Sequence, residues 1–179
     1  GFCLVGSEMC IRDRFKSLNF SSKKINIKKF KKPAKQNEIL VSTIIADNEA
    51  ASVEKCINSL GVKAKVKKYL HFEIDATDRL DINTIVSTDV LFNPSKEYIA
   101  NIKEESGIYR FLVRSKDDIV GQSLAQTLQD RFNLSGLKSI KKGVVWEVKI
   151  NSSRAKKDVD IILNSHIFSN PISQECHEY

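Results

Sequence analysis

The residues that could act as nucleophiles, bases or metal ligands are few and scattered along the chain. Its 179 residues include three histidines and four cysteines. They are His71, His166, His177, Cys3, Cys10, Cys56 and Cys176. No CxxC spacing, phosphate-binding glycine loop, GxGxxG motif or triad pattern accompanies them. The sequence therefore predicts no catalytic residue, no cofactor and no metal site in this chain.

The pair Cys176–His177 places a thiol next to an imidazole. Neighbouring residues of a strand point to opposite faces, so we expect these two groups to lie apart. His71 falls in an alternating strand pattern and is expected on the solvated face of that strand. His166 follows a predicted helix, where a positive charge near the C-terminal end would be favourable.

The net charge of +7 comes from the start of the chain. Residues 1–37 carry ten lysines and arginines and two acids, whereas the remainder carries 19 basic and 20 acidic residues. A neutral folded part disfavours a nucleic-acid-binding fold. No apolar run approaches the ~20 residues of a membrane span, so we expect no membrane partner. Cysteines without a disulfide framework are typical of a reducing compartment such as the cytoplasm.

The start of the chain divides into two segments. Residues 1–14 resemble a peptide that appears when sequencing-adapter DNA is translated, and we expect them to be non-native. Residues 15–37 contain eight lysines and few apolar residues, which predicts a basic, disordered leader. A polyanion-binding arm, with Phe20 and Phe30 between the lysines, is the alternative.

Residues 38–104 predict a first unit of alternating strands and helices. The apolar positions between Val53 and Leu60 follow helical spacing, and Asp47 can cap the start of that helix. The expected strands cover residues 38–45, 64–75 and 96–102. A tight turn near Lys67–Lys68 would make the middle strand a hairpin; without the turn it is one long strand.

Residues 108–179 repeat the same order of elements, and the offset between matched landmarks rises from 71 through 74 to 77, which indicates small insertions between elements. The matched landmarks are Asp47 with Asp118, Phe72 with Trp146, Glu73 with Glu147, and Asn93–Pro94 with Asn170–Pro171. Units of this size are marginal alone, so two copies are expected to bury a shared face. The sequence predicts an α+β fold of two tandem ferredoxin-like (βαββαβ) units, related as a pseudo-dimer by an approximate twofold axis.

Three stretches of the second unit carry a family resemblance. They read FLVRSKDDIVGQSLAQTLQ, KGVVWEVKI and ILNSHIFSNPISQECHEY. These resemble the first strand and helix, the glutamate-bearing strand and the closing segment of PurS, the small subunit of phosphoribosylformylglycinamidine synthase. The first unit departs from the pattern, with Ala50 or Ala51 at the position of the first glycine and Tyr69 at that of Gly143. Tandem PurS-like units also resemble the N-terminal region of fused PurS–PurL chains, so the chain is expected to be either complete or the front of such a fusion.

The resemblance implies a non-catalytic part of an ATP- and glutamine-dependent ligase of purine biosynthesis. In that family the PurS part joins a PurL-like synthetase to a PurQ-like glutaminase and supports ammonia transfer, while ATP and Mg²⁺ belong to the synthetase. Exposed strand faces and edges are therefore the expected partner-contact surfaces. The candidate contact residues are Glu73, Glu147, Tyr98 and Tyr179.

Two other functions remain open at this point. A regulatory pair of ACT-like modules would bind a small molecule between the units, beside a glycine in the first strand–helix loop; only Gly121 comes close. An RNA-binding ferredoxin-like protein would display several stacking aromatic residues on its central strands. Here the strand aromatics are Tyr69 and Phe72 in one unit and Trp146 in the other.

Overall fold

The computed structural model describes residues 27–31, 37–77 and 82–179. In this part of the chain it contains one seven-stranded sheet and four helices. The strands are β1 (Lys28–Lys29), β2 (Asn37–Thr43), β3 (Ala64–Ala76), β4 (Glu97–Ile99), β5 (Ile108–Ser115), β6 (Leu137–Ile150) and β7 (Gln174–Glu178). The helices are α2 (Asn48–Ser59), α3 (Ile82–Val86), α4 (Ile119–Phe132) and α5 (Ala155–Asn164).

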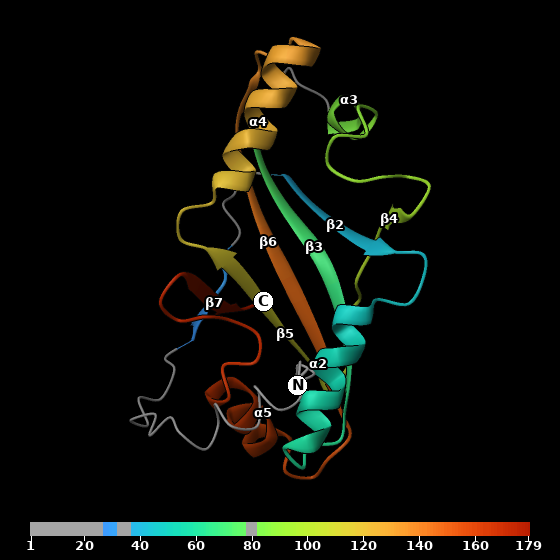
Figure 1. The fold of residues 1–179 in the computed structure, drawn as a ribbon, viewed down its shortest axis with the longest axis vertical. Helices are drawn as coiled ribbons and strands as arrows, with labels where there is room; N and C mark the ends of the chain where they lie inside the picture. The colour runs from blue at the N-terminus through green and yellow to red at the C-terminus, as the bar shows by residue number, and fades with distance from the viewer. Residues whose placement is uncertain (1–26, 32–36, 78–81) are drawn as a thin grey trace, which may run out of the picture.

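The two longest strands, β3 and β6, form the centre of the sheet (Figure 1). They pair antiparallel along nearly their whole length, with Ala64 opposite Ile150 and Leu70 opposite Val144. The full strand order is β1-β7-β5-β6-β3-β2-β4. Outward from the centre, each half therefore places its middle strand, its first strand and then its last strand. An α+β fold is confirmed, and the order of strands in one half mirrors that in the other.

Of the two alternatives for the middle strand, the structure has one long strand in each half, and the strand pair of the βαββαβ order is not formed. Lys67 and Lys68 lie inside the continuous strand β3, and Gly143 lies inside β6. Each half therefore runs strand, helix, long strand, helix, strand, rather than βαββαβ. The physical reason is that Lys67–Lys68 lacks the glycine or asparagine that a two-residue hairpin turn requires, while the period-two alternation continues through it.

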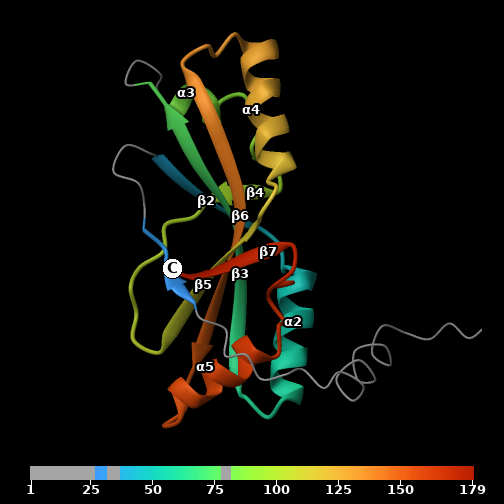
Figure 2. The same ribbon diagram turned by 90° about the vertical axis from the view of Figure 1, so that its left-hand side faces the viewer.

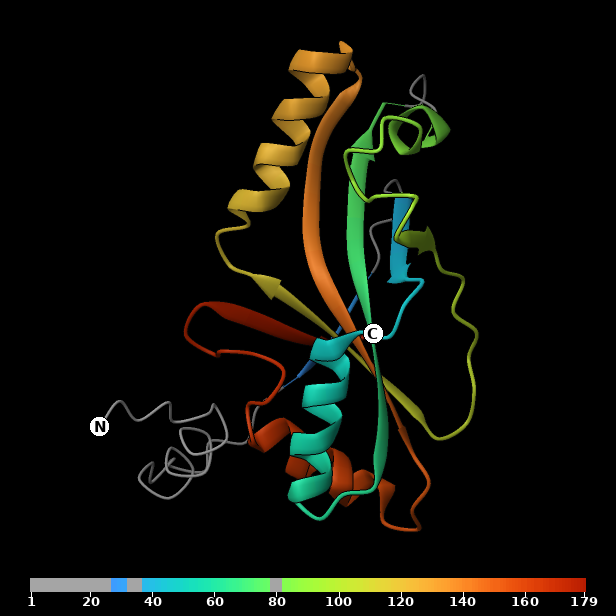
Figure 3. The ribbon, with the colours of Figure 1, turned by 45° about the vertical axis from the view of Figure 1, so that its right-hand side comes forward.

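All four helices contribute to cores on one face of the sheet (Figures 2 and 3). At one end, Ile57 of α2 and Ile162 of α5 join a buried cluster with Val148 of β6. At the other end, Ile85 of α3 and Leu128 of α4 join a second cluster around β2, β3 and β6. Within the described residues, no helix is long and apolar enough to cross a membrane.

Residues 27–31 differ from the predicted disordered leader. Lys28 and Lys29 form β1, which pairs in parallel with β7, and the Phe30 amide donates to the Glu178 carbonyl at 2.7 Å. The apolar side chain of Ile27 packs against the first core cluster, and that of Phe30 packs on the opposite face of the sheet. Burial of these two side chains explains why this short basic segment is ordered. Residues 1–26 and 32–36, with Phe20 and the adapter-like peptide, lie outside the described residues.

Candidate functional site

The face of the sheet opposite the helices, called here the helix-free face, carries an unusual set of charged side chains. Strand alternation directs Leu40, Tyr69, Leu112 and Val145 to this face, where they form a small buried cluster. Segments distant in the sequence cover that cluster. They contribute Phe30, Ala100, Ile102 and Tyr179. Charged residues next to this cover are consequently removed from water.

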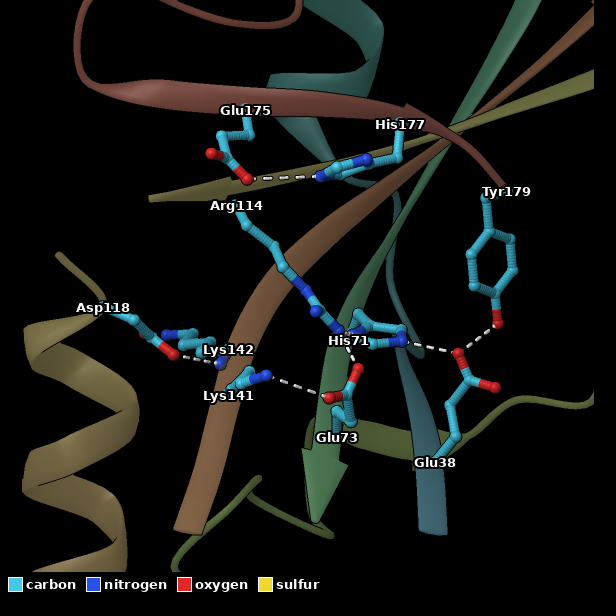
Figure 4. A network of polar contacts seen from close by, with 10 residues as sticks. All are labelled: Glu38, His71, Glu73, Arg114, Asp118, Lys141, Lys142, Glu175, His177 and Tyr179. Atoms are coloured by element: carbon cyan, nitrogen blue, oxygen red, sulfur yellow. Dashed lines mark hydrogen bonds and ion pairs between the residues drawn. The ribbon is translucent and has the colours of Figure 1, made fainter. Parts of the chain in front are cut away.

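The first group of charges is the Glu73 cluster, which consists of Glu38, His71, Glu73, Arg114, Lys141 and Tyr179 (Figure 4). The side chain of Glu73 is only 3% exposed. Its Oε2 accepts a hydrogen bond of 2.6 Å from Arg114 Nη2, and its Oε1 lies 3.5 Å from Lys141 Nζ. A buried carboxylate is stable only when cations compensate it, and these two cations supply that compensation.

His71 connects the two ends of this cluster. Arg114 Nη2 lies 3.4 Å from His71 Nδ1, and His71 Nε2 lies 2.5 Å from Glu38 Oε1. Because a guanidinium can only donate, Nδ1 accepts, and Nε2 carries the hydrogen that is donated to Glu38. The His71 side chain is fully buried. The arrangement fixes one tautomer of the ring.

Tyr179 closes the cluster from the end of β7. Its hydroxyl donates to Glu38 Oε1 at 2.6 Å, although the two residues lie 141 positions apart. Burial, and then the hydrogen bond to Glu38, raise the pKa of the Tyr179 hydroxyl. The hydroxyl therefore stays protonated at neutral pH and acts as a donor. The bond joins β2 to the end of β7, which lie on opposite sides of the central strand pair.

A glycine allows Arg114 to reach the cluster. Arg114 lies on β5 and Glu73 on β3, with β6 between them and Gly143 directly opposite Arg114. A Cβ atom at Gly143 would lie 2.8 Å from Leu112 Cδ1 and 3.0 Å from Arg114 Cγ. The missing side chain thus leaves room for the arginine to cross the strand. A role in packing explains the glycine at this position.

Phe30 covers the cluster. Its ring stacks on Tyr179 with centroids 5.7 Å apart and meets His71 edge-on at the same separation. The Arg114 guanidinium carbon lies 4.9 Å from the centre of the Phe30 ring, within the range of a cation–π contact. One side chain from the basic leader therefore contacts three members of the Glu73 cluster.

The second group of charges is the Glu147 cluster, which consists of Lys67, Tyr69, Arg110 and Glu147. Arg110 Nε donates to Glu147 Oε2 at 2.8 Å, and Lys67 Nζ lies 3.9 Å from Glu147 Oε1. Burial, and next the negative charge of Glu147, raise the pKa of Tyr69 to about 12. The two acidic residues of the repeat therefore lie in equivalent ionic surroundings, each with one arginine and one lysine.

Asp118 performs a different task at the start of α4. Its Oδ1 accepts a hydrogen bond from the Gly121 amide at 3.0 Å. Its Oδ2 accepts one from the Lys142 amide at 2.8 Å, and this second bond is drawn in Figure 4. The carboxylate caps the helix and also joins it to β6. A Cβ at Gly121 would lie 2.4 Å from the Ile140 carbonyl oxygen, so only glycine permits this close approach.

The structure corrects the expected exposure of three residues. Glu73 is 3% exposed, Glu147 6% and His71 0%, although the sequence pattern placed all three on a solvated strand face. The alternation was read correctly, but the second face is covered by chain segments remote in sequence. Of the candidate contact residues, Tyr98 is half-exposed on β4 and Tyr179 is partly buried at the end of β7.

The remaining histidines and cysteines do not come together. Cys176 packs at the margin of the helix-side core, where burial raises the pKa of its thiol to about 11. His177 lies on the opposite face of β7 and its Nε2 is 3.4 Å from Glu175. His166 follows α5. In the described residues, no three His, Cys, Asp or Glu side chains are placed to share a metal ion.

Sequence reasoning missed Arg110, Arg114, Lys141 and Glu38 as members of these clusters. A signal was present, because Arg110 and Arg114 are the two charges in the otherwise apolar pattern of β5. A charged residue that lies two positions from a buried residue on a central strand is on the same face of the sheet. Such a charged residue therefore requires a buried partner. The chemistry of both clusters is mutual charge compensation, which stabilises the sheet.

Comparison with known proteins gives no independent assignment. No family model matches the chain, and no curated protein matches it.

Proposed function

We propose that the chain is a non-catalytic assembly module of phosphoribosylformylglycinamidine synthase, built from two PurS-type units in tandem. In this role it links a PurL-like synthetase to a PurQ-like glutaminase in the cytoplasm and supports the transfer of glutamine-derived ammonia. ATP and Mg²⁺ are bound by the synthetase, and this chain binds no cofactor of its own.

The pairing of β3 with β6 carries the proposal. Glu73 lies opposite Lys141, and Lys67 lies opposite Glu147. The alignment that matches Phe72 with Trp146 also matches Glu73 with Glu147 and Lys67 with Lys141. The glutamate of each central strand thus lies opposite a lysine of the other strand, and the strand order outward from this pair is the same in both halves. A pseudo-dimer of two PurS-type units joined head to tail would have both features.

The roles of the motif residues point the same way. Asp118 fastens α4 to β6, Gly121 permits that approach, Gly143 admits Arg114, and Glu147 is neutralised by Arg110. Each of these motif residues is accounted for by a contact within the chain. A module that maintains its own architecture, and performs no reaction, would use its residues in this way.

The closing strands are the proposed contact surfaces for the enzyme's other parts. Tyr98 of β4 is 49% exposed, and Tyr179 lies at the end of β7. Glu73 and Glu147 are not proposed as contact residues, because they are buried. Their function in the proposal is to hold the two units in register.

Reconstitution tests the proposal. The full chain is mixed with the synthetase and glutaminase of a bacterium whose PurS is a separate subunit, from which that PurS has been omitted. We expect the chain to co-elute with both components and to increase glutamine-dependent formation of formylglycinamidine ribonucleotide. The increase is expected because the missing link between ammonia source and acceptor is restored.

The control is the same synthetase supplied with free ammonium in place of glutamine. That activity bypasses transfer between components, and a linking module should leave it unchanged. Absence of co-elution together with absence of glutamine-dependent stimulation would reject the proposed function. Stimulation of the ammonium-dependent reaction would instead indicate a direct part in catalysis.

A further inference from the structure

Each of the two long central strands has a stretch of edge that faces a helix instead of a strand. β2 pairs with β3 only at residues 70–74, so no described strand lies beside residues 64–69 on that side. β5 pairs with β6 only at residues 143–149, so no described strand lies beside residues 137–142 on that side. Helix α2 lies along the first stretch and α4 along the second (Figure 3). Backbone amides on these edges therefore need acceptors other than a strand.

In the N-terminal half, side chains of α2 accept these hydrogen bonds. The Val66 amide donates to Glu54 Oε2 at 3.0 Å, and the Ala64 amide donates to Asn58 Oδ1 at 3.1 Å. Lys65 Nζ donates to the other oxygen of Glu54, Oε1, at 2.8 Å. The hydrogen bond from Lys65, and then that from the Val66 amide, lower the pKa of Glu54. The acceptor at this edge is therefore an ionised carboxylate.

The C-terminal half lacks a carboxylate at the equivalent place. The alignment that matches the capping aspartates makes Ala125 of α4 the equivalent of Glu54. The alignment that matches the central strands makes Ile140 of β6 the equivalent of Val66. The side chain of alanine has no group that could accept a hydrogen bond from the strand.

The amide of Ile140 is nevertheless directed toward α4. The Lys142 amide is directed away from β3, because it donates to Asp118 Oδ2 at 2.8 Å. Amide directions repeat at every second residue of a strand, so the Ile140 amide has the same direction. Among the residues that the structure describes, no group of α4 accepts a hydrogen bond from it. An amide in this position requires a water molecule or a ligand as its acceptor.

A groove of about 330 Å³ lies at this place, between α4 and β6. This volume is at the lower end of the range for small-molecule sites. Ala125, Ile140 and Lys138 line the groove. The Lys138 ammonium is 3.8 Å from Asp75, and its side chain is 61% exposed, so it can also contact a ligand. Asp130 lines the groove as well, which favours a ligand with one negative charge over a ligand with two.

We propose that this groove binds the carboxylate of a small organic acid, which accepts a hydrogen bond from the Ile140 amide as Glu54 accepts one from Val66. Lys138 supplies the ammonium contact that Lys65 supplies to Glu54. Hydrogen bonds to a charged acceptor are stronger than those to a neutral one, so the site selects carboxylates. This inference goes beyond the proposed function and does not depend on it.

Titration of the full chain with propionate, followed by amide NMR, tests the proposal. Propionate has the same carboxylate and carbon chain as a glutamate side chain. We expect the Ile140 amide proton to move downfield and to saturate with a dissociation constant of roughly 10 mM. The Val66 amide should not move, because Glu54 already accepts its hydrogen bond. Propionamide has the same shape without the charge and should have a much smaller effect.

Ala125→Glu supplies the carboxylate from the chain itself. In this variant we expect the Ile140 amide to lie downfield without ligand, and the affinity for propionate to fall by at least about tenfold. Ser123→Glu is the matched control, because Ser123 is an exposed residue of α4 that does not line the groove. It adds the same charge to the same helix and should leave propionate binding unchanged.

Glu54→Ala makes the reciprocal change in the other half, and its outcome does not require Ala125→Glu to fold. The Val66 amide loses its acceptor in this variant. We expect it to respond to propionate as the Ile140 amide does in the unaltered chain. The Glu54 side chain is 21% exposed, so its truncation should leave the fold intact.

Three results would overturn the proposal. An Ile140 amide that does not respond to propionate in the unaltered chain would mean that the groove holds water only. A folded Ala125→Glu variant with an unchanged response would place the bound carboxylate elsewhere. A Val66 amide that stays unresponsive in Glu54→Ala would reject the equivalence of the two edges. Reconstituted enzyme activity enters none of these measurements, so the two proposals fail separately.

Discussion

Asp47 in the N-terminal half and Asp118 in the C-terminal half occupy equivalent positions but have different partners. Asp47 caps α2, and its Oδ2 lies 3.4 Å from the side-chain amine of Lys68. Asp118 caps α4 and accepts from the backbone amide of Lys142. Lys142 is the equivalent of Lys68 in the alignment of the two central strands. The same landmark therefore joins its helix to the sheet through a lysine side chain in one half and through a backbone amide in the other.

The arginines show a second difference. Arg110 and Arg114 of β5 neutralise Glu147 and Glu73. In the alignment that matches Asp47 with Asp118, the equivalent positions of β2 are Ile39 and Thr43. Both carboxylates thus obtain their arginine from the C-terminal half. The two halves have a glutamate at equivalent positions of their central strands but divide the cations unequally.

The largest loss of stability is expected from removing Arg114, the residue of the C-terminal half that donates a hydrogen bond to Glu73. Arg114→Met leaves Glu73 buried with only Lys141 beside it, and should lower the free energy of unfolding by about 4 kcal/mol. Replacing both partners, Arg114→Met with Glu73→Met, should recover most of that loss because no charge is left buried. Urea denaturation followed by circular dichroism measures both. A double variant no more stable than the single one would contradict the role assigned to the pair.

A smaller loss of stability is expected from substitutions that exchange glycine and alanine at the equivalent positions near the starts of α4 and α2. Gly121→Ala forces a Cβ against the Ile140 carbonyl and should cost about 3 kcal/mol. The reverse change in the other half, Ala50→Gly, introduces only the flexibility of a helical glycine and should cost about 1 kcal/mol. Thermal or urea unfolding of the two variants compares the halves directly. Equal losses would mean that Asp118 does not hold α4 closer than Asp47 holds α2.

The third prediction concerns Phe30, which follows β1 and covers the Glu73 cluster; β1 pairs with β7 of the C-terminal half, and among the described strands β4 has no such neighbour. Phe30→Ala removes the ring that contacts His71, Tyr179 and Arg114, and should cost about 2 kcal/mol. Lys28→Ala in the same strand should stay within about 0.5 kcal/mol of the parent, because its side chain is exposed. Hydrogen exchange of the β7 amides provides the local measurement, with faster exchange expected only in Phe30→Ala.

The smallest effect is confined to alkaline pH. The pKa of Tyr69 is raised to about 12 in the folded chain, so its contribution to stability is complete below the ordinary tyrosine pKa of about 10. That contribution should disappear as the pH rises from about 10 to about 12, and Tyr69→Phe should remove this part of the decline. Tyrosinate absorbance checks the titration, and an ordinary midpoint for Tyr69 would contradict its burial beside Glu147.

Local features of the fold could be predicted from the sequence. The capping aspartates Asp47 and Asp118 and the helical spacing after them located α2 and α4, because these signals lie within a few residues of the element they specify. The alternation around Phe72 and Trp146 identified the central strands. The continuity of those strands was undecided, since it depends on the absence of a turn at Lys67–Lys68 and of one at the equivalent position.

Burial on the helix-free face could not be predicted. Glu73 and His71 alternate with apolar residues, a pattern that is the same whether their face meets water or protein. The cover comes from Phe30, Ile102 and Tyr179, which lie far from β3 in the sequence. The strands through which the two halves pair could not be predicted either. A repeated pattern in the sequence indicates two units, but it does not specify the edge that they share.

The hydrogen bond from Tyr179 to Glu38, and the pairing of β3 with β6, have a consequence for the order in which the chain can fold. During synthesis β3 emerges long before β6, so a 13-residue strand with the buried acid Glu73 has an open edge while its partner is still being made. Contacts of such long sequence separation slow folding and prolong the exposure of that edge. The N-terminal half should consequently depend on chaperones, or aggregate, until the second half arrives to complete its sheet.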